Sequence, residues 1–261
     1  MIRFHPSAQQ LVSFVDGNLS PAVSLMVSAH CDMCSTCQRF VEQETERLAG
    51  SLLEGSLSEG FLLEENGSKS ADFNPDYSTM IAQITQTPSS LEADSGFKLH
   101  ATSDKNKFSS SNTVPVVNTI ANNSRESAIE LDGKVFTLPR TLQRYIEKTG
   151  SWSSLVGKLW QAPVDLGSQG VANFIYMGKG GSVPEHTHRG TEYTLVLNGE
   201  FSDGLNSYDS GDFIFMDGQN THTPRSDHSQ GCLVFTIVDQ PLHFTSGIAR
   251  LLNPFSHLFF R

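Results

Sequence analysis

The stretch GGSVPEHTHRGTEYTLVLNG, residues 180–199, decides how the second half of this chain folds. Its histidines, its second glutamate and two of its glycines follow the pattern G-x5-H-x-H-x3-E-x6-G, through Gly180, His186, His188, Glu192 and Gly199. His186, His188 and Glu192 have equal parity, so a continuous strand would point all three side chains to one face, whereas a turn at residues 189–191, RGT, would weaken that argument. The stretch therefore predicts a strand-borne cluster of metal-binding side chains.

A second motif follows about one strand pair later. In GDFIFMDGQNTH, Gly211 and His222 stand eleven positions apart. Short runs rich in Val, Ile, Phe and Tyr surround both motifs and are separated by Gly, Asn and Asp, a pattern typical of an all-β sandwich or barrel. Three imidazoles and a carboxylate converging inside a barrel would bind a divalent metal and leave room for exogenous ligands. A barrel that has lost its metal is the alternative.

These two motifs resemble those of the cupin superfamily, which implies a small antiparallel barrel with a metal site of three histidines and one glutamate. By position the ligands are His186, His188, Glu192 and His222. The second motif departs from the usual form, since Asp217 and Gln219 replace a common Pro and Gly, and Ser226 replaces a frequent Asn. The remaining histidines of this half and of the linker lack such spacing and are predicted to be surface or core residues: His100, His228, His243 and His257.

The first 85 or so residues have a helical pattern instead. Ser7 and Gln10 form a capping-box signature, and Ser20 with Pro21 is a second helix start. Apolar residues then recur at helical spacing, which predicts further helices around residues 40–48 and 77–84. We expect a small helical bundle.

One histidine and three cysteines fall within nine positions of this bundle, in AHCDMCSTC, residues 29–37. His30, Cys34 and Cys37 have the spacing H-x3-C-x2-C, which on one helix places all three on the same face. Tetrahedral zinc needs a fourth ligand, and His5, just before the first helix, is the candidate. Four protein ligands would close the site and make it structural. Cys31 lies off the ligand face and is interpreted as a spare thiol.

Other interpretations of the cluster remain open. Cys34-x-x-Cys37 alone would fit a thioredoxin-like redox motif, although no βαβ pattern precedes it. A coincidental cluster is a further alternative, and His5 could be an ordinary N-terminal histidine.

The composition changes between the two halves. Residues 87–128 are rich in Ser, Asn and Thr and show no sustained period, which predicts a polar linker. The chain is thus divided into a helical domain at 1–86, this linker, a barrel at 129–245 and a C-terminal tail at 246–261, with the two domains separable. The fold class is multidomain α plus all-β: a small zinc-binding helical bundle followed by a cupin-type antiparallel β-barrel.

Charge and hydropathy restrict the function. The formal net charge is -10 and the pI about 5.3, which argues against a surface that neutralises nucleic-acid phosphates. The start, MIRFHPSAQQ, lacks the features of a signal peptide, and no window approaches the ~20 apolar residues of a membrane span. We expect a cytoplasmic protein that binds neither nucleic acid nor membrane directly.

A helical module with His5 and H-x3-C-x2-C, followed by a cupin, resembles the ChrR-type zinc-binding anti-sigma factors over roughly residues 1–85 and 129–245. The resemblance implies a regulator without enzymatic activity. Its helical domain would hold Zn2+ through His5, His30, Cys34 and Cys37 and sequester an extracytoplasmic-function-type sigma factor. Its cupin domain would hold a divalent metal, taken as Zn2+, and tune release in response to singlet oxygen or organic peroxide.

The alternative function is a cupin metalloenzyme, such as a dioxygenase or an isomerase, with the helical part as a regulatory module. An open metal in the barrel could support it. A zinc-finger nucleic-acid binder conflicts with the acidic charge and with the lack of a basic recognition helix. Co-purification of a sigma-like protein would favour the first function, and turnover of a small substrate the second.

Overall fold

A computed structural model of the chain describes residues 1–59, 119–121, 127–155, 157–169, 171–247, 249–251 and 253. The described residues up to Leu53 and from Thr119 onward belong to one compact unit. The predicted fourth helix around residues 77–84 and most of the stretch expected to be a linker lie outside the described residues. No described helix is both long and apolar enough to cross a membrane.

Three helices open the chain: α1 (Ala8–Val15), α2 (Pro21–Met33) and α3 (Ser35–Glu59). Both predicted helix starts are confirmed. Ser7 and Gln10 exchange hydrogen bonds between side chain and backbone at 3.2 and 2.8 Å, and Ser20 caps α2 directly before Pro21. The caps satisfy amide groups that have no partner inside the first turn of a helix.

The prediction that His30, Cys34 and Cys37 share one face of a single helix is wrong. Cys34 ends α2 with an extended backbone (φ -120°, ψ 99°), although its amide still donates to the His30 carbonyl oxygen at 2.8 Å. The extended residue redirects the chain before α3 begins. His30 therefore comes from the last turn of α2, Cys34 from the junction and Cys37 from the first turn of α3.

The first β structure is a three-stranded antiparallel sheet of β1 (Thr119–Ala121), β2 (Ser127–Leu131) and β3 (Lys134–Thr137). The tight turn between β2 and β3 uses Asp132 and Gly133, both with positive φ, as a two-residue hairpin requires. Strand β1 and the start of β2 fall inside the stretch expected to be a linker, so β structure begins before residue 129.

The remaining strands form the barrel, and all their pairings are antiparallel. One sheet has the order β4-β5-β6-β14-β9-β13-β7, with β10 and β11 also pairing β9, and a second has the order β12-β8-β15. The strands are β4 (Ser153–Ser154), β5 (Leu159–Asp165), β6 (Val171–Met177), β7 (Gly181–Ser182), β8 (His186–Thr187), β9 (Glu192–Ser202), β10 (Ser207–Asp209), β11 (Phe213–Met216), β12 (Thr221–His222), β13 (Arg225–Ser226), β14 (Cys232–Val238) and β15 (His243–Phe244). The predicted fold class, helical region then antiparallel cupin-type barrel, is confirmed.

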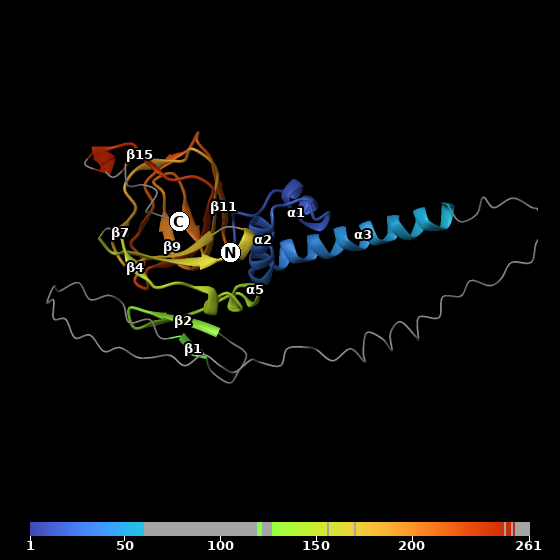
Figure 1. Cartoon of the computed structure of the whole chain (residues 1–261), viewed down its shortest axis with the longest axis horizontal. Helices are drawn as coiled ribbons and strands as arrows, with labels where there is room; N and C mark the ends of the chain where they lie inside the picture. Colours follow the sequence, from blue (N-terminus) through green and yellow to red (C-terminus); the bar gives the residue numbers. More distant parts are fainter. Residues whose placement is uncertain are drawn as a thin grey trace, which may run out of the picture. The chain divides into compact units, whose positions relative to one another are not determined.

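Strand β9 is buried on both faces. Val196 packs inside the barrel with the cluster that contains Met216, whereas Leu195 belongs to the cluster that contains Met26 of α2. The period of two along a strand produces this division, and the hydrophobic run of β9 suits a strand covered on both sides. The helical part therefore packs on the outside of the barrel, next to β11 (Figure 1), and does not stand apart as two separable domains would.

Polar contacts reinforce this packing. A short helix, α5 (Arg140–Gln143), lies against α2, where the amide of Thr141 donates to the Asp32 carboxylate at 2.7 Å. The hydroxyls of Ser28 and Thr141 lie 3.2 Å apart. Two described parts that are distant in the sequence thus meet through both apolar and polar groups.

Candidate metal centres

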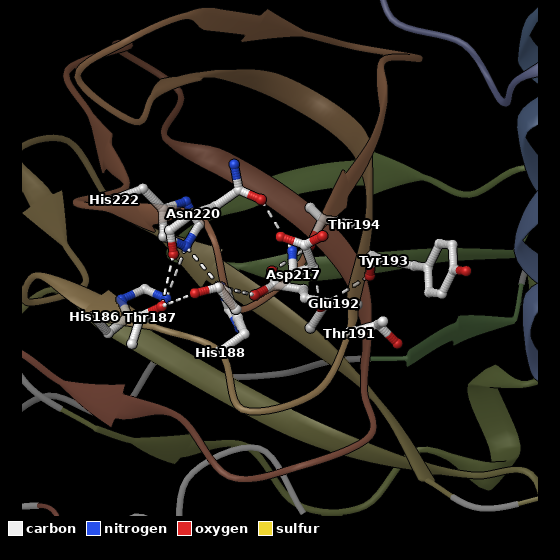
Figure 2. A network of polar contacts seen from close by, with 12 residues as sticks. His186, Thr187, His188, Thr191, Glu192, Tyr193, Thr194, Asp217, Asn220 and His222 are labelled. Atoms are coloured by element: carbon white, nitrogen blue, oxygen red, sulfur yellow. Dashed lines mark hydrogen bonds and ion pairs between the residues drawn. The ribbon is translucent and has the colours of Figure 1, made fainter.

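The four residues of the cupin-like motifs come together inside the barrel (Figure 2). His186 lies on β8 and His222 on the paired strand β12, where the two residues are register partners. His188 follows β8, and Glu192 is the first residue of β9. One ligand atom from each residue lies within 4.8 Å of the others.

Equal parity along one strand is not what aligns them, because the chain bends between His188 and Glu192. The bend is held by Asp239, whose carboxylate accepts from the amide and the hydroxyl of Thr191 at 2.6 and 2.7 Å. This bend requires glycine at position 190, because the Cβ of any other residue would clash with the Asp239 carboxylate at 2.4 Å. The bend, and not the alternation of side chains along one strand, places Glu192 next to the histidines.

The distances in this cluster fit a single metal ion. The Nε2 atom of His222 lies 2.9 Å from His186 Nε2 and 3.0 Å from His188 Nε2. Ligand atoms at about 2.1 Å from one ion and at right angles around it are separated by about 3.0 Å. The spacing of the histidine nitrogens therefore fits adjacent positions around an ion with more than four ligands. Such an ion would keep open positions for exogenous ligands.

The protonation of the imidazoles also fits a metal. His186 Nδ1 lies 2.8 Å from the carbonyl oxygen of Pro184 and is its natural donor, which leaves the lone pair on Nε2 facing the cluster. Burial lowers the pKa of His188 to about 4 and that of His222 to about 3, and it also lowers the pKa of His186. Neutral imidazoles are the form of histidine that binds a metal, so a cation could bind between the three Nε2 atoms.

Two threonines that sequence reasoning missed hold the carboxylate. Thr194 Oγ1 donates to Glu192 Oε1 at 2.6 Å, and Thr236 Oγ1 lies 3.4 Å from the same oxygen. The other carboxylate oxygen, Oε2, lies 3.2 Å from His188 Nε2 and faces the cluster. Such supporting hydrogen bonds orient a metal ligand. The only signal available in the sequence was that Thr194 shares a strand face with Glu192.

The cavity above the cluster is small, about 40 Å³, and its wall is mostly apolar. Met177, Met216 and Leu242 are among its lining residues, and the polar side chains of the wall are those of His186, Glu192, His222, Thr194 and Thr236. One water needs roughly 10–15 Å³ of such space, so an ion with a few waters or a small oxidant fits, whereas typical ligand pockets hold several hundred Å³.

The departures from the usual second motif leave its turn intact. The Asp217 carboxylate accepts from the amide of Gln219 at 2.9 Å, and the Asn220 side chain accepts from the amide of Asp217 at 3.0 Å. Thr187 Oγ1 donates to the carbonyl oxygen of Asn220 at 2.8 Å. Side-chain hydrogen bonds of this kind replace the Pro and Gly that would otherwise shape the turn. Ser226 is buried and donates to the carbonyl oxygen of Glu200 at 2.7 Å.

The second candidate centre joins His5, His30, Cys34 and Cys37, whose ligand atoms also lie within 4.8 Å of one another. His5 Nδ1 lies 3.5 Å from Cys34 Sγ and 3.4 Å from Cys37 Sγ. A thiolate and an imidazole bound to one tetrahedral zinc are separated by about 3.5 Å. The described residues thus form a closed set of two sulfur and two nitrogen donors, which is typical of structural zinc.

His30 is the buried member of this set. Its Nδ1 lies 2.8 Å from the carbonyl oxygen of Gly211, and its Nε2 is buried without a hydrogen-bond partner in the described part of the chain. Burial lowers its pKa to about 4, so the ring is neutral. A neutral imidazole with one nitrogen bonded to a carbonyl and the other unpaired next to two cysteines is the arrangement of a metal ligand.

The thiols fit the same interpretation. Burial and the neighbouring Cys34 raise the pKa of Cys37 to about 12, so without a cation this site disfavours the thiolate that a metal requires. Cys31 lies outside the group, and burial raises its pKa to about 11. The raised pKa of Cys37 is the opposite of the low pKa typical of a redox-active Cys-x-x-Cys motif.

The other histidines that the structure describes, His228 and His243, belong to neither group. His228 is exposed and its Nδ1 accepts from the amide of Gln230 at 3.3 Å, and His243 lies on β15. His100 and His257 lie outside the described residues.

The fold and the two centres define a class of protein with a helical module held around a Cys/His group and a cupin barrel built around a His/Glu group. Residues 147–241 match the family model of the ChrR cupin-like domain. The expected resemblance to the ChrR-type proteins is thereby confirmed.

Two comparisons, one of sequence and one of structure, extend the likeness beyond the barrel. The anti-sigma-E factor ChrR of Cereibacter sphaeroides is 26% identical over 258 residues, which cover 97% of this chain and 98% of that protein. A chain in the crystal structure of Rhodobacter sphaeroides SigE in complex with the anti-sigma ChrR matches with a TM-score of 0.57 and 23% identity, covering 92% of this chain and 100% of that one. The helical module and the barrel therefore occur together in a known regulator.

Proposed function

We propose that this protein is an anti-sigma factor that binds an extracytoplasmic-function-type sigma factor through its helical part and releases it under oxidative stress sensed by the barrel. One observation carries the proposal: the likeness to the anti-sigma-E factor ChrR runs along 97% of the chain and is not confined to the barrel. A likeness confined to the barrel would support only the fold.

The two centres have different roles in this proposal. His5, His30, Cys34 and Cys37 hold a structural Zn2+ that fixes the junction of α2 and α3, because a closed set of ligands leaves no position for a substrate. His186, His188, Glu192 and His222 hold a divalent metal, Zn2+ in our proposal, next to a cavity that a small oxidant can enter. The first centre maintains a fold, and the second can respond to what reaches it.

The charge of the molecule supports a basic partner. The formal net charge is -10, and the start of α3 presents Glu42 and Glu46 to solvent. A sigma factor needs basic surfaces for promoter DNA, so an acidic helical module is suited to dock beside them, and nucleic acid itself is a poor partner. Such a partner also places the protein in the cytoplasm.

The alternative of a cupin metalloenzyme has less support. In the described residues, the cavity wall offers no acid or base beyond the cluster itself. The relative that matches along the whole chain is named as a regulator, not as an enzyme.

Co-purification from the native cell tests the proposal directly. We expect a sigma-like protein in stoichiometric amount, and its absence together with turnover of a small substrate would favour the enzyme. In a reporter assay with that sigma factor, His186→Ala combined with His188→Ala should leave repression intact and abolish induction by singlet oxygen and organic peroxide.

The matched control for the reporter assay is His228→Ala, which removes an exposed histidine outside both groups. It should repress and respond as the wild type does. Normal induction in the doubly substituted protein would exclude a sensor role for the barrel.

A further inference from the structure

Two of the four ligands of the helical centre are positioned by one turn of the barrel. The turn is Gly211–Asp212, between β10 and β11. The Asp212 side chain is fully buried, and its Oδ1 accepts from the amides of Arg3 at 2.7 Å and Phe4 at 3.0 Å. The chain enters His5 directly after these two amides.

Two further hydrogen bonds fix the turn itself and the segment before His5. Asp212 Oδ2 accepts from the amide of Asp209 at 2.9 Å, which closes the turn itself. The amide of Phe213 donates to the carbonyl oxygen of Phe4 at 2.9 Å. The segment before His5 is therefore bonded to the barrel through its amides and through a carbonyl. A carboxylate that accepts three amide hydrogen bonds is a strong and specific anchor.

Gly211 contacts His30, the second imidazole of the helical centre. Its carbonyl oxygen accepts from His30 Nδ1 at 2.8 Å and so directs the Nε2 lone pair toward the cysteines. Gly211 has φ +93°, and a Cβ at this position would lie 2.4 Å from the side chain of Ile2. Only glycine allows the N-terminal segment to pack this closely on the turn.

We propose that the Gly211–Asp212 turn is a positioning element of the helical metal centre, with Asp212 fixing the segment that carries His5 and Gly211 fixing the ring of His30. The barrel thereby sets the affinity of the helical centre for its metal. The inference rests on the proposed metal at His5, His30, Cys34 and Cys37. It adds that contacts with the barrel control the affinity of that site for the metal.

The physical reason is preorganisation. His5 is exposed and lies in a segment, residues 1–7, that has no helix or strand of its own, so contacts with the rest of the fold must order it. The Asp212 anchor supplies that order before the metal arrives, so binding costs less conformational entropy. Groups that orient metal ligands from outside typically change metal affinity by about 10–100-fold when they are removed.

The turn also connects the helical centre to the barrel centre. Strand β11 runs from Phe213, next to the turn, to Met216, which lines the cavity and is the register partner of Glu192. A displacement of β11 by an oxidant or ligand in the cavity would thus move the residues that hold His5 and His30. The structure provides a direct covalent path of six residues, 211–216, between the two centres.

The test uses the full chain loaded with Co2+, because thiolate-to-metal charge transfer reports the helical centre alone: the barrel group contains no sulfur ligand. Asp212→Asn keeps the shape of the side chain but forces an amide NH2 against at least one backbone N–H. We expect the metal affinity of the helical centre, measured by competition with a chelator, to fall about 10–100-fold. The metal content of the barrel should not change.

Asp203→Ala is the matched control. Asp203 is also a buried carboxylate of the barrel and accepts from the amides of Leu205 and Asn206 and from the Tyr208 hydroxyl, so its described hydrogen bonds stay within the barrel and do not reach the backbone before His5. This substitution should leave the charge-transfer band and the chelator competition within twofold of the wild type. An equal loss of affinity in both variants, or none in Asp212→Asn, would overturn the inference.

A measurement on the unsubstituted protein covers the case in which Asp212→Asn does not fold. With the barrel centre filled, adding metal to the helical centre should slow hydrogen exchange at the amides of Arg3, Phe4 and Phe213, because coupling between metal and turn is reciprocal. Unchanged exchange at these amides would contradict the inference. A wild-type protein without thiolate charge transfer would instead show that the proposed helical metal itself is wrong.

Discussion

His30 and Gly211 share a hydrogen bond of 2.8 Å although 181 positions separate them in the chain. One belongs to the last turn of α2 and the other to a turn of the barrel. The bond makes the environment of a candidate ligand in the helical module depend on the barrel, and both candidate metal centres are parts of one folded unit. Predictions about one centre therefore need a readout of the other.

Removing a thiolate of the helical centre should release its metal and loosen the helices. We expect Cys34→Ser or Cys37→Ser to lose one equivalent of Zn2+ and part of the helical circular dichroism, because metal binding is coupled to folding. Cys31→Ser, at a cysteine outside the group, is the control and should retain both. A helical protein that contained no zinc before substitution would contradict this prediction.

The barrel centre should depend on the hydroxyl of Thr236. Thr236→Val keeps the shape of this buried side chain and removes its contact with Glu192, so the metal affinity of the barrel should fall about 10-fold. Thr221→Val changes an exposed threonine on β12 and should have no effect on metal binding. Competition with a chelator measures both, and equal affinities would exclude a supporting role for Thr236.

Gly199 should be irreplaceable for a steric reason. It has φ +82°, and a Cβ there would lie 2.1 Å from the carbonyl oxygen of Gly231, so Gly199→Ala should lower the free energy of unfolding by at least about 3 kcal/mol. Gly204 has a similar φ of +93° with open space around it, and Gly204→Ala should cost about 1–2 kcal/mol. Urea unfolding compares the two, and equal costs would show that the close approach is unimportant.

The metal-free protein should lose stability in mild acid. The pKa of His30 is lowered to about 4 by burial, so the unfolded chain, with a pKa of about 6.5, binds the proton more tightly. Stability from this group is complete above pH 6.5 and falls toward pH 4, by up to roughly 3 kcal/mol. His188 and His222 act with the same sign.

Urea unfolding between pH 7.5 and 4 measures the effect, with the pH values chosen to bracket the ordinary histidine pKa of about 6.5. His30→Gln removes one titrating group and should flatten the curve in part. A stability that stays constant over this range would contradict the assigned burial of the three imidazoles.

The residue types and spacings in the sequence were enough to predict the fold class and to select the residues that the structure brings together in two clusters. The pattern through His186, His188 and Glu192 indicated a barrel with a metal site, and H-x3-C-x2-C indicated a closed Cys/His group. Helix caps at Ser7 and Ser20 could also be predicted, because a cap is a contact between residues three positions apart. Features of this kind depend only on residues that are close together in the sequence, so a short stretch of chain is enough to predict them.

Tertiary structure decided how these residues meet. The bend before Glu192 depends on Asp239, and the orientation of His30 depends on Gly211, partners that no local spacing reveals. The break at Cys34 likewise replaces the single helix that the spacing favoured. The linker-like composition suggested two separable domains, but burial of both faces of β9 joins the helices to the barrel. Such contacts depend on which apolar surfaces remain to be covered once each part has formed, and that is a property of the whole fold.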